Sequence, residues 1–120
     1  MADLIERLMG VHPTRSKIPV HQFQAIAAEW ARGNFTGAQA QTAIEAVSGT
    51  PLSAAEQTEA QAIVNGFTSI PVTGSATAVA DGRARRALRL AEIDQVFLLV
   101  DAQVPPYDNP AAVRTRLGLP

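Results

Sequence analysis

The sequence predicts an all-α protein: a small helical bundle of five to six helices around a central C-terminal helix at about 83–103. Three observations predict this class. Apolar residues recur at steps of three and four in most segments, which is the spacing of an amphipathic helix. Glycine and proline separate these segments, and the β-branched residues are too scattered to establish a strand. A chain of 120 residues is expected to form one domain, 1–120.

The N-terminal third is expected to hold two helices joined by an extended connector. The first helix covers residues 1–10 and carries its apolar residues on one face. Residues 11–19 contain two prolines, which rule out a continuous helix and favour an extended path. The second helix covers residues 20–32, with Phe23 and Trp30 as its anchors, and a proline suits its first turn.

Residues 36–67 are expected to form a helical hairpin. Thr36 suits the cap of its first helix, and Ser53 with Glu56 three residues later forms a capping box that opens the second. The short turn between them contains glycine and proline. From residue 34 to residue 80 the chain has no lysine or arginine, so the surface of this region is expected to be mildly acidic.

The central helix at 83–103 carries two apolar stripes, so we expect it to contact neighbours on more than one side. The first stripe contains Ala84, Ala87, Leu88 and Ala91, and the second contains Leu90, Ile93, Phe97, Val100 and Val104. Its start is open: a helix from Ser75 and a loop through Asp81 both fit the sequence. After it, two prolines begin a C-terminal arm, 104–120, with one short helix capped by Asn109.

Composition and motifs exclude several activities. The formal net charge is −1, which gives no global attraction to nucleic acid or anionic membranes, and the longest apolar run is too short to span a bilayer. No cysteine is present, and His12 and His21 are the only imidazoles, so a zinc site lacks its usual ligands. No nucleophile elbow or phosphate-binding loop occurs. We therefore expect no enzymatic activity, no metal, no cofactor and no membrane partner. The N-terminus lacks the apolar core of a signal peptide, so synthesis and folding in a cytoplasm are expected.

One dense basic cluster remains, formed by Arg83, Arg85, Arg86 and Arg89. Four guanidinium groups within two helical turns suit phosphate or an acidic protein surface, including the acidic middle segment of another subunit. The plainer interpretation is a solvated face with local pairs, Asp81 to Arg85 and Arg89 to Glu92. We favour this interpretation or a protein partner, since no aromatic side chain interleaves the arginines as a single-strand platform requires.

The segment from Leu4 to Phe23, LIERLMGVHPTRSKIPVHQF, resembles the opening of small proteins encoded among the structural genes of tailed bacteriophages and prophages. The resemblance continues through Glu29 to Thr36 and the Ala/Gln-rich helix, then the LSAAE turn, and again at Ile93 to Leu99; residues 71–82 depart from it. It implies a virion-associated or assembly protein with no family active site.

Together these observations predict a non-enzymatic bacteriophage virion structural or assembly protein, located in the virion and made in the host bacterial cytoplasm. Its partners would be itself, as a homo-oligomer, and larger capsid, tail or fibre proteins. The alternative is a small helical regulatory or nucleic-acid-associated protein that uses the basic cluster. The expected partner-binding residues are exposed apolar residues of the two arms and the arginines: Val11, Ile18, Arg83, Arg85, Arg86, Arg89, Tyr107 and Leu119.

Overall fold

The computed structural model describes residues 4–105 and 107–119, and these form six α-helices and no strand, which confirms the predicted all-α class. The parts of the predictions that concern residues 1–3, Pro106 and Pro120 lie outside the described residues. The helices are α1 (Leu4–Met9), α2 (Val20–Ala31), α3 (Gly37–Ser48), α4 (Ala54–Thr68), α5 (Ala76–Ala102) and α6 (Pro110–Leu117).

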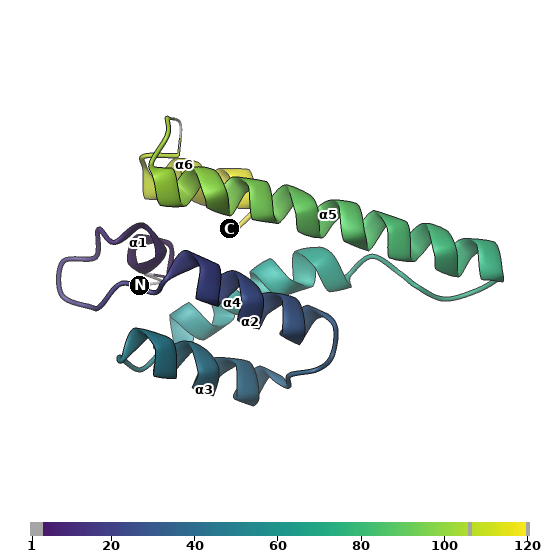
Figure 1. Ribbon diagram of the computed structural model, residues 1–120, viewed down its shortest axis with the longest axis horizontal. Helices are drawn as coiled ribbons and strands as arrows, with labels where there is room; N and C mark the ends of the chain where they lie inside the picture. The colour runs from purple at the N-terminus through teal and green to yellow at the C-terminus, as the bar shows by residue number, and fades with distance from the viewer. Residues whose placement is uncertain (1–3, 106, 120) are drawn as a thin grey trace.

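Helix α5 runs along one side of the molecule, with α1 to α4 together on its inner side and α6 beside its C-terminal half (Figure 1). Helix α2 is the second organising element, because it packs against α3, α4 and α5. The core lies between these helices. At its centre the rings of Phe23 and Phe97 meet edge to face, with their centroids 5.6 Å apart.

The predicted helix caps are present. Thr36 accepts a hydrogen bond from the backbone N–H of Gln39, whose side chain accepts one from Thr36 N–H in return. Ser53 and Glu56 form the same reciprocal pair at the start of α4. These bonds satisfy backbone donors that have no partner inside the helix, so the two capping boxes fix where α3 and α4 begin.

Helix α5 begins seven residues before the predicted residue 83, so the expectation of a loop through Asp81 is wrong and the start near Ser75 is confirmed. Ser75 caps the helix by accepting a hydrogen bond from Ala78 N–H. Gly82 does not interrupt the helix, because it is the point where the preceding loop touches α5. A Cβ there would lie 2.1 Å from the carbonyl oxygen of Pro71, so only glycine allows this close approach.

The predicted hairpin at 36–67 is opened out. Helices α3 and α4 follow each other across a short turn, but each packs mainly on α2. A pocket remains where the two helices diverge.

Only one of the two apolar stripes of α5 enters the core of the subunit. Ile93, Phe97 and Val100 are buried, but Val104, which follows the end of the helix, is 43% exposed. The first stripe, Ala84, Ala87, Leu88 and Ala91, is exposed throughout. Within the subunit, therefore, α5 does not contact neighbours on the side of the first stripe. All the helices that α5 contacts cover its inner side, and 3.6 residues per turn place the first stripe on the outer side.

Candidate functional site

The four arginines of the basic cluster do not form one surface. Arg83 and Arg85 are exposed, but Arg86 turns into the molecule, where its Nε donates to the carbonyl oxygen of Ile70 at 2.7 Å. Its guanidinium also donates to Thr68 O and lies over the ring of Phe67. Arg86 therefore ties the loop after α4 to α5.

The predicted local pairs are confirmed in part. Arg89 pairs with Glu92 at 3.3 Å, as the i,i+3 spacing predicts. The predicted pair between Asp81 and Arg85 is not among the ion pairs of the described residues. Both side chains belong to exposed residues, where water competes with the ion pair.

A shallow groove of about 450 Å³ lies between α2, α5 and the loop before α5. Arg83 and Arg86 line it from α5, and Arg32 joins them from the C-terminal end of α2. Its apolar lining includes Phe67, Val72 and Leu90. The structure thus places Arg32 at the same groove as Arg83 and Arg86 of the cluster, and all three lie near apolar side chains.

The N-terminal connector folds back on its own chain and does not extend away from it. His12 Nδ1 accepts hydrogen bonds from the backbone N–H groups of Thr14 and Arg15, which turns the chain. The N–H of Ile18 then donates to the carbonyl oxygen of Arg7 at 3.0 Å. The prediction that Ile18 is an exposed contact residue is wrong: its side chain is 0% exposed and belongs to the core. Val11, at 49% exposure, fits the prediction.

The C-terminal arm also packs on its own chain. Tyr107 and Leu119, which were expected to be exposed, are half-buried against the core. Arg116 lies over the ring of Tyr107, 5.8 Å from its centroid. Tyr107 and Leu119 each keep some exposed surface, but both side chains pack against the core of their own subunit.

An ion network that the sequence analysis missed joins the connector, α1 and the start of α4. The side chain of Arg7 is fully buried and donates to Glu56 Oε2 at 3.1 Å and to the carbonyl oxygen of Ser16 at 3.0 Å. It also reaches the carbonyl oxygens of Thr50 and Pro51 in the turn before α4. Burial of Glu56 raises its pKa, but hydrogen bonds from Ser53 N–H and Arg7 outweigh burial, and the pKa lies below its usual value.

A second ion network joins α6 to α1 and α4. Arg114 donates from two nitrogens to Glu6 and from Nε to Glu59 Oε1 at 2.8 Å. The hydrogen bonds from Arg114 to Glu6 raise the pKa of the arginine, although burial opposes this. Arg114 thus connects the first and last helices of the described chain.

These networks contradict the expectation of a free acidic surface in the middle segment. Glu56 and Glu59 are buried partners of arginines, and Glu45 accepts a hydrogen bond from Leu52 N–H. The carboxylates of this segment are therefore used within the subunit, not by the arginine cluster of another one. A signal was present: Glu56 and Glu59 share helical spacing with Ile63 and Phe67, which places them on the apolar face of α4.

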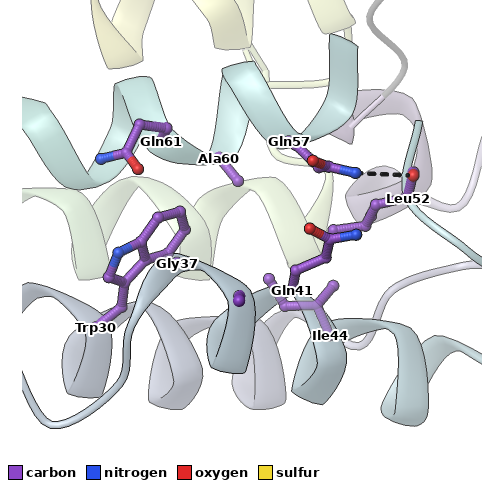
Figure 2. Close-up of a pocket in the computed structure, with 9 residues that line it drawn as sticks. Trp30, Gly37, Gln41, Ile44, Leu52, Gln57, Ala60 and Gln61 are labelled. Atoms are coloured by element: carbon purple, nitrogen blue, oxygen red, sulfur yellow. Dashed lines mark hydrogen bonds between the residues drawn. The ribbon is translucent and has the colours of Figure 1, made fainter. Parts of the chain in front are cut away.

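The space between α3 and α4 is a pocket of about 280 Å³. Figure 2 shows Trp30 of α2 and Ala60 of α4 at one part of this pocket, with Gln41 and Ile44 of α3 at another. Gln57 Nε2 donates to the carbonyl oxygen of Leu52 at 3.3 Å (Figure 2). Every lining side chain is apolar or an uncharged amide, so the pocket suits packing against an uncharged group.

Across residues 4–105 and 107–119, no group of three or more His, Cys, Asp or Glu side chains is placed to hold a metal ion. None of the helices in this part of the chain combines the length and hydrophobicity of a membrane-spanning segment.

Two exposed large apolar side chains, Leu88 and Leu98, lie on the outer side of α5. Six exposed residues form a stripe along this side of the helix, which we call the outer face of α5: Ala84, Leu88, Ala91, Gln95, Leu98 and Ala102. Leu88 is 62% exposed and Leu98 is 51% exposed, although both sit in a well-formed helix.

No protein-family model, curated protein or solved structure matches this chain.

Proposed function

We propose that this protein is a non-enzymatic structural or assembly protein of a bacteriophage virion. It acts through protein–protein contacts with itself or with larger capsid, tail or fibre proteins. One observation carries the proposal: the outer face of α5 leaves Leu88 and Leu98 in water along a helix of 27 residues. Exposed apolar residues aligned along one helix face, here with Gln95 among them, are more typical of an interaction surface than single scattered ones.

The outer face of α5 is a stronger candidate than the two arms. Ile18 is buried in the subunit, and the side chains of Tyr107 and Leu119 are partly buried against the core. A helix face needs no rearrangement before it docks, so little conformational entropy is lost on binding. The similarity of residues 4–23 to small proteins of tailed phages supplies the biological setting of the proposal.

Purified particles of the phage or induced prophage that carries the chain test this proposal. Mass spectrometry is expected to detect the chain in gradient-purified particles at a fixed ratio to the major capsid or tail protein. A chain carrying Leu88→Glu and Leu98→Glu is expected to be lost from particles, because burying a carboxylate without a partner is costly. Val47→Glu, at an exposed apolar site on α3, is the matched control. Absence of the wild-type chain from particles contradicts the proposal.

A second candidate is a small nucleic-acid-associated protein, because the structure brings Arg32 next to Arg83 and Arg86 at the groove. The occupied donors of Arg86 and the Arg32–Glu29 pair weaken this candidate. A salt titration with duplex DNA separates the two. Binding that falls steeply with salt and is reduced by Arg83→Ala with Arg85→Ala supports this second candidate. Binding that is undetectable at low salt removes it.

A further inference from the structure

We propose that two copies of this chain pair through the outer faces of their α5 helices, which run antiparallel to each other. This inference rests on the proposed function, because it names a second copy of the chain as the partner that binds the outer face of α5. Two features of α5 lead to it: the spacing of its exposed residues and the distribution of its charges.

The exposed residues follow the seven-residue repeat of a coiled-coil seam. From Ala84 onward the outer face has steps of 4, 3, 4, 3 and 4, and all six positions are exposed. The residues that enter the core, Ile93, Phe97 and Val100, lie on the opposite side of the helix. A helix with a seam on one side and its own core on the other can pair without disturbing the subunit.

The charges of α5 are separated along its length. The N-terminal half carries one carboxylate, Asp81, and four arginines, Arg83, Arg85, Arg86 and Arg89, a net charge of +3, whereas the C-terminal half carries Glu92, Asp94 and Asp101, a net charge of −3. A parallel pair would place the two arginine-rich halves side by side. An antiparallel pair places each arginine-rich half against an acidic half, and the helix dipoles oppose each other as well. Charge complementarity therefore selects a second copy in the antiparallel orientation.

One register satisfies both packing and charge in the central layers of the seam, and it places Leu98 opposite Asp81 of the other copy nearer each end. With the two-fold axis between residues 89 and 90, Leu88 of each copy faces Ala91 of the other, so a large residue meets a small one in each central layer. Arg85 of each copy then lies beside Glu92 of the other, which gives two symmetric ion pairs across the seam. Glu92 is available because its present pair with Arg89 is an exposed i,i+3 contact, which contributes little.

The position of this register also fits the shape of the subunit. The N-terminal half of α5 extends past the ends of the other helices (Figure 1). Helix α6 lies beside the C-terminal half of α5 (Figure 1), but Leu98 and Ala102 of the outer face stay exposed there, so the second copy can cover this half as well.

Charge exchange tests the register. Sedimentation equilibrium of the full chain from about 1 μM to about 1 mM is expected to show a monomer–dimer equilibrium. Arg85→Glu and Glu92→Arg, each alone, place like charges at both ion pairs and are expected to weaken the dimer about tenfold. The double variant Arg85→Glu/Glu92→Arg restores opposite charges and is expected to recover dimerisation. Circular dichroism of each variant checks that the helices are retained.

The orientation is tested separately with a spin label. The sequence has no cysteine, so Ala102→Cys carries a single label. In the antiparallel register, residue 102 lies opposite residue 77 of the other copy, which puts the two labels on the order of 40 Å apart. A parallel pair would put them within about 15 Å, because residue 102 would lie beside its own counterpart.

The outcomes separate this inference from the proposed function. A wild-type chain that stays monomeric at about 1 mM overturns the α5 pair. A dimer that is unchanged by Leu88→Glu but lost in Val11→Glu also overturns it, while leaving a self-associating structural protein in place. A chain that dimerises as described but is absent from particles contradicts the proposed function alone.

Discussion

Arg7 is a cation with no exposed side-chain surface, and it holds α1 in place within the subunit. Its guanidinium joins α1 to the connector and to the turn before α4. Arg15 and Ser16 of the connector add further polar contacts to Glu56 and to this turn. A buried ion pair adds little net stability by comparison with apolar packing, but removal of one partner leaves an uncompensated charge. The two partners are therefore strongly coupled.

Replacing Arg7 with methionine is expected to lower the free energy of unfolding by about 3 kcal/mol, because Glu56 loses its buried partner and keeps only the partly exposed Arg15. Urea denaturation measures this change. Arg32→Met, which removes an exposed ion pair on α2, is the matched control and is expected to change the same free energy by about 0.5 kcal/mol or less. The double variant Arg7→Met/Glu56→Gln is expected to be more stable than Arg7→Met. An Arg7→Met variant as stable as the control would mean that the network is not buried in solution.

The lowered pKa of Glu56 makes stability depend on acid pH. A carboxyl whose pKa is lower in the folded state contributes stability that is full above its unfolded value, near 4.5, and is lost as the pH falls through the folded value. The unfolding free energy is therefore expected to fall as the pH is lowered below about 4.5, and to fall less steeply in Glu56→Gln. Denaturation at a series of pH values measures both slopes. Equal slopes would show that Glu56 is not ionised and paired in the native state.

At the level of single elements, α5 has two sides with opposite roles. Its inner side holds Phe97 against Phe23, and its outer side holds Leu88 in water. The same helix therefore contains one residue whose loss opens a cavity and one whose loss changes only exposed surface.

Phe97→Ala is expected to lower the free energy of unfolding by about 3–5 kcal/mol, because a large ring leaves the core. Leu88→Ala, measured at a concentration low enough to keep the chain monomeric, is expected to change it by about 0.5 kcal/mol or less. Thermal or urea denaturation of the two variants in parallel checks both values. Similar effects of the two substitutions would mean that the sides of α5 are assigned the wrong way round.

The elements that the sequence predicted well are those set by local chemistry. The capping boxes of α3 and α4 were readable because both partners lie within three residues of each other. The two stripes of α5 differ in composition, because the stripe that contains Ile93, Phe97 and Val100 has larger apolar side chains than the alanine-rich one. Whether another helix also covers the alanine-rich stripe was not readable, because that depends on packing between segments far apart in the sequence. The same limit applies to Ile18, whose burial depends on the connector folding back to Arg7.

The candidate interaction site was predicted only in part. Val11 and the exposed arginines are at the surface, but the outer face of α5 was expected to be covered, and the buried role of Arg7 was not foreseen. Arg7 and Glu56 are 49 residues apart, and no local pattern joins them. The one available sign was the position of Glu56 and Glu59 on the apolar face of α4. Carboxylates buried there need cations from other segments as partners.

At the level of the whole molecule, the C-terminal arm is part of the fold. Helix α6 buries Val113 and Leu117, and Arg114 donates hydrogen bonds to both Glu6 and Glu59. Its removal would expose apolar surface on α1 and α5 and leave Glu59 without its cation. Deletion of residues 107–120 is therefore expected to destabilise the protein as a whole, not only to weaken contacts with partners.

Arg114→Met tests this role without deleting the helix. It is expected to lower the thermal midpoint by several degrees, because about 1–3 kcal/mol is lost when a buried carboxylate loses a hydrogen-bonded partner. Arg116→Met, two residues away on an exposed position, is the control for general effects on α6. If the two variants have the same thermal midpoint, α6 is held by apolar packing alone.

The pairing of Glu6 with Arg114 also has a consequence for the order in which the chain acquires its structure. The two residues are 108 positions apart, so closing that contact is among the most entropically demanding events of folding. A nascent chain displays the apolar face of α1 long before α6 has been synthesised, and α1 is too short to be stable alone. Ribosome-bound chains that end at residue 103 are expected to be digested by protease at residues 4–18, whereas released chains that include α6 resist. Protection of that segment in the shorter chains would show that α1 docks without α6. Stable docking of α1 is thus expected to follow the synthesis of α6, because the two helices can meet only then.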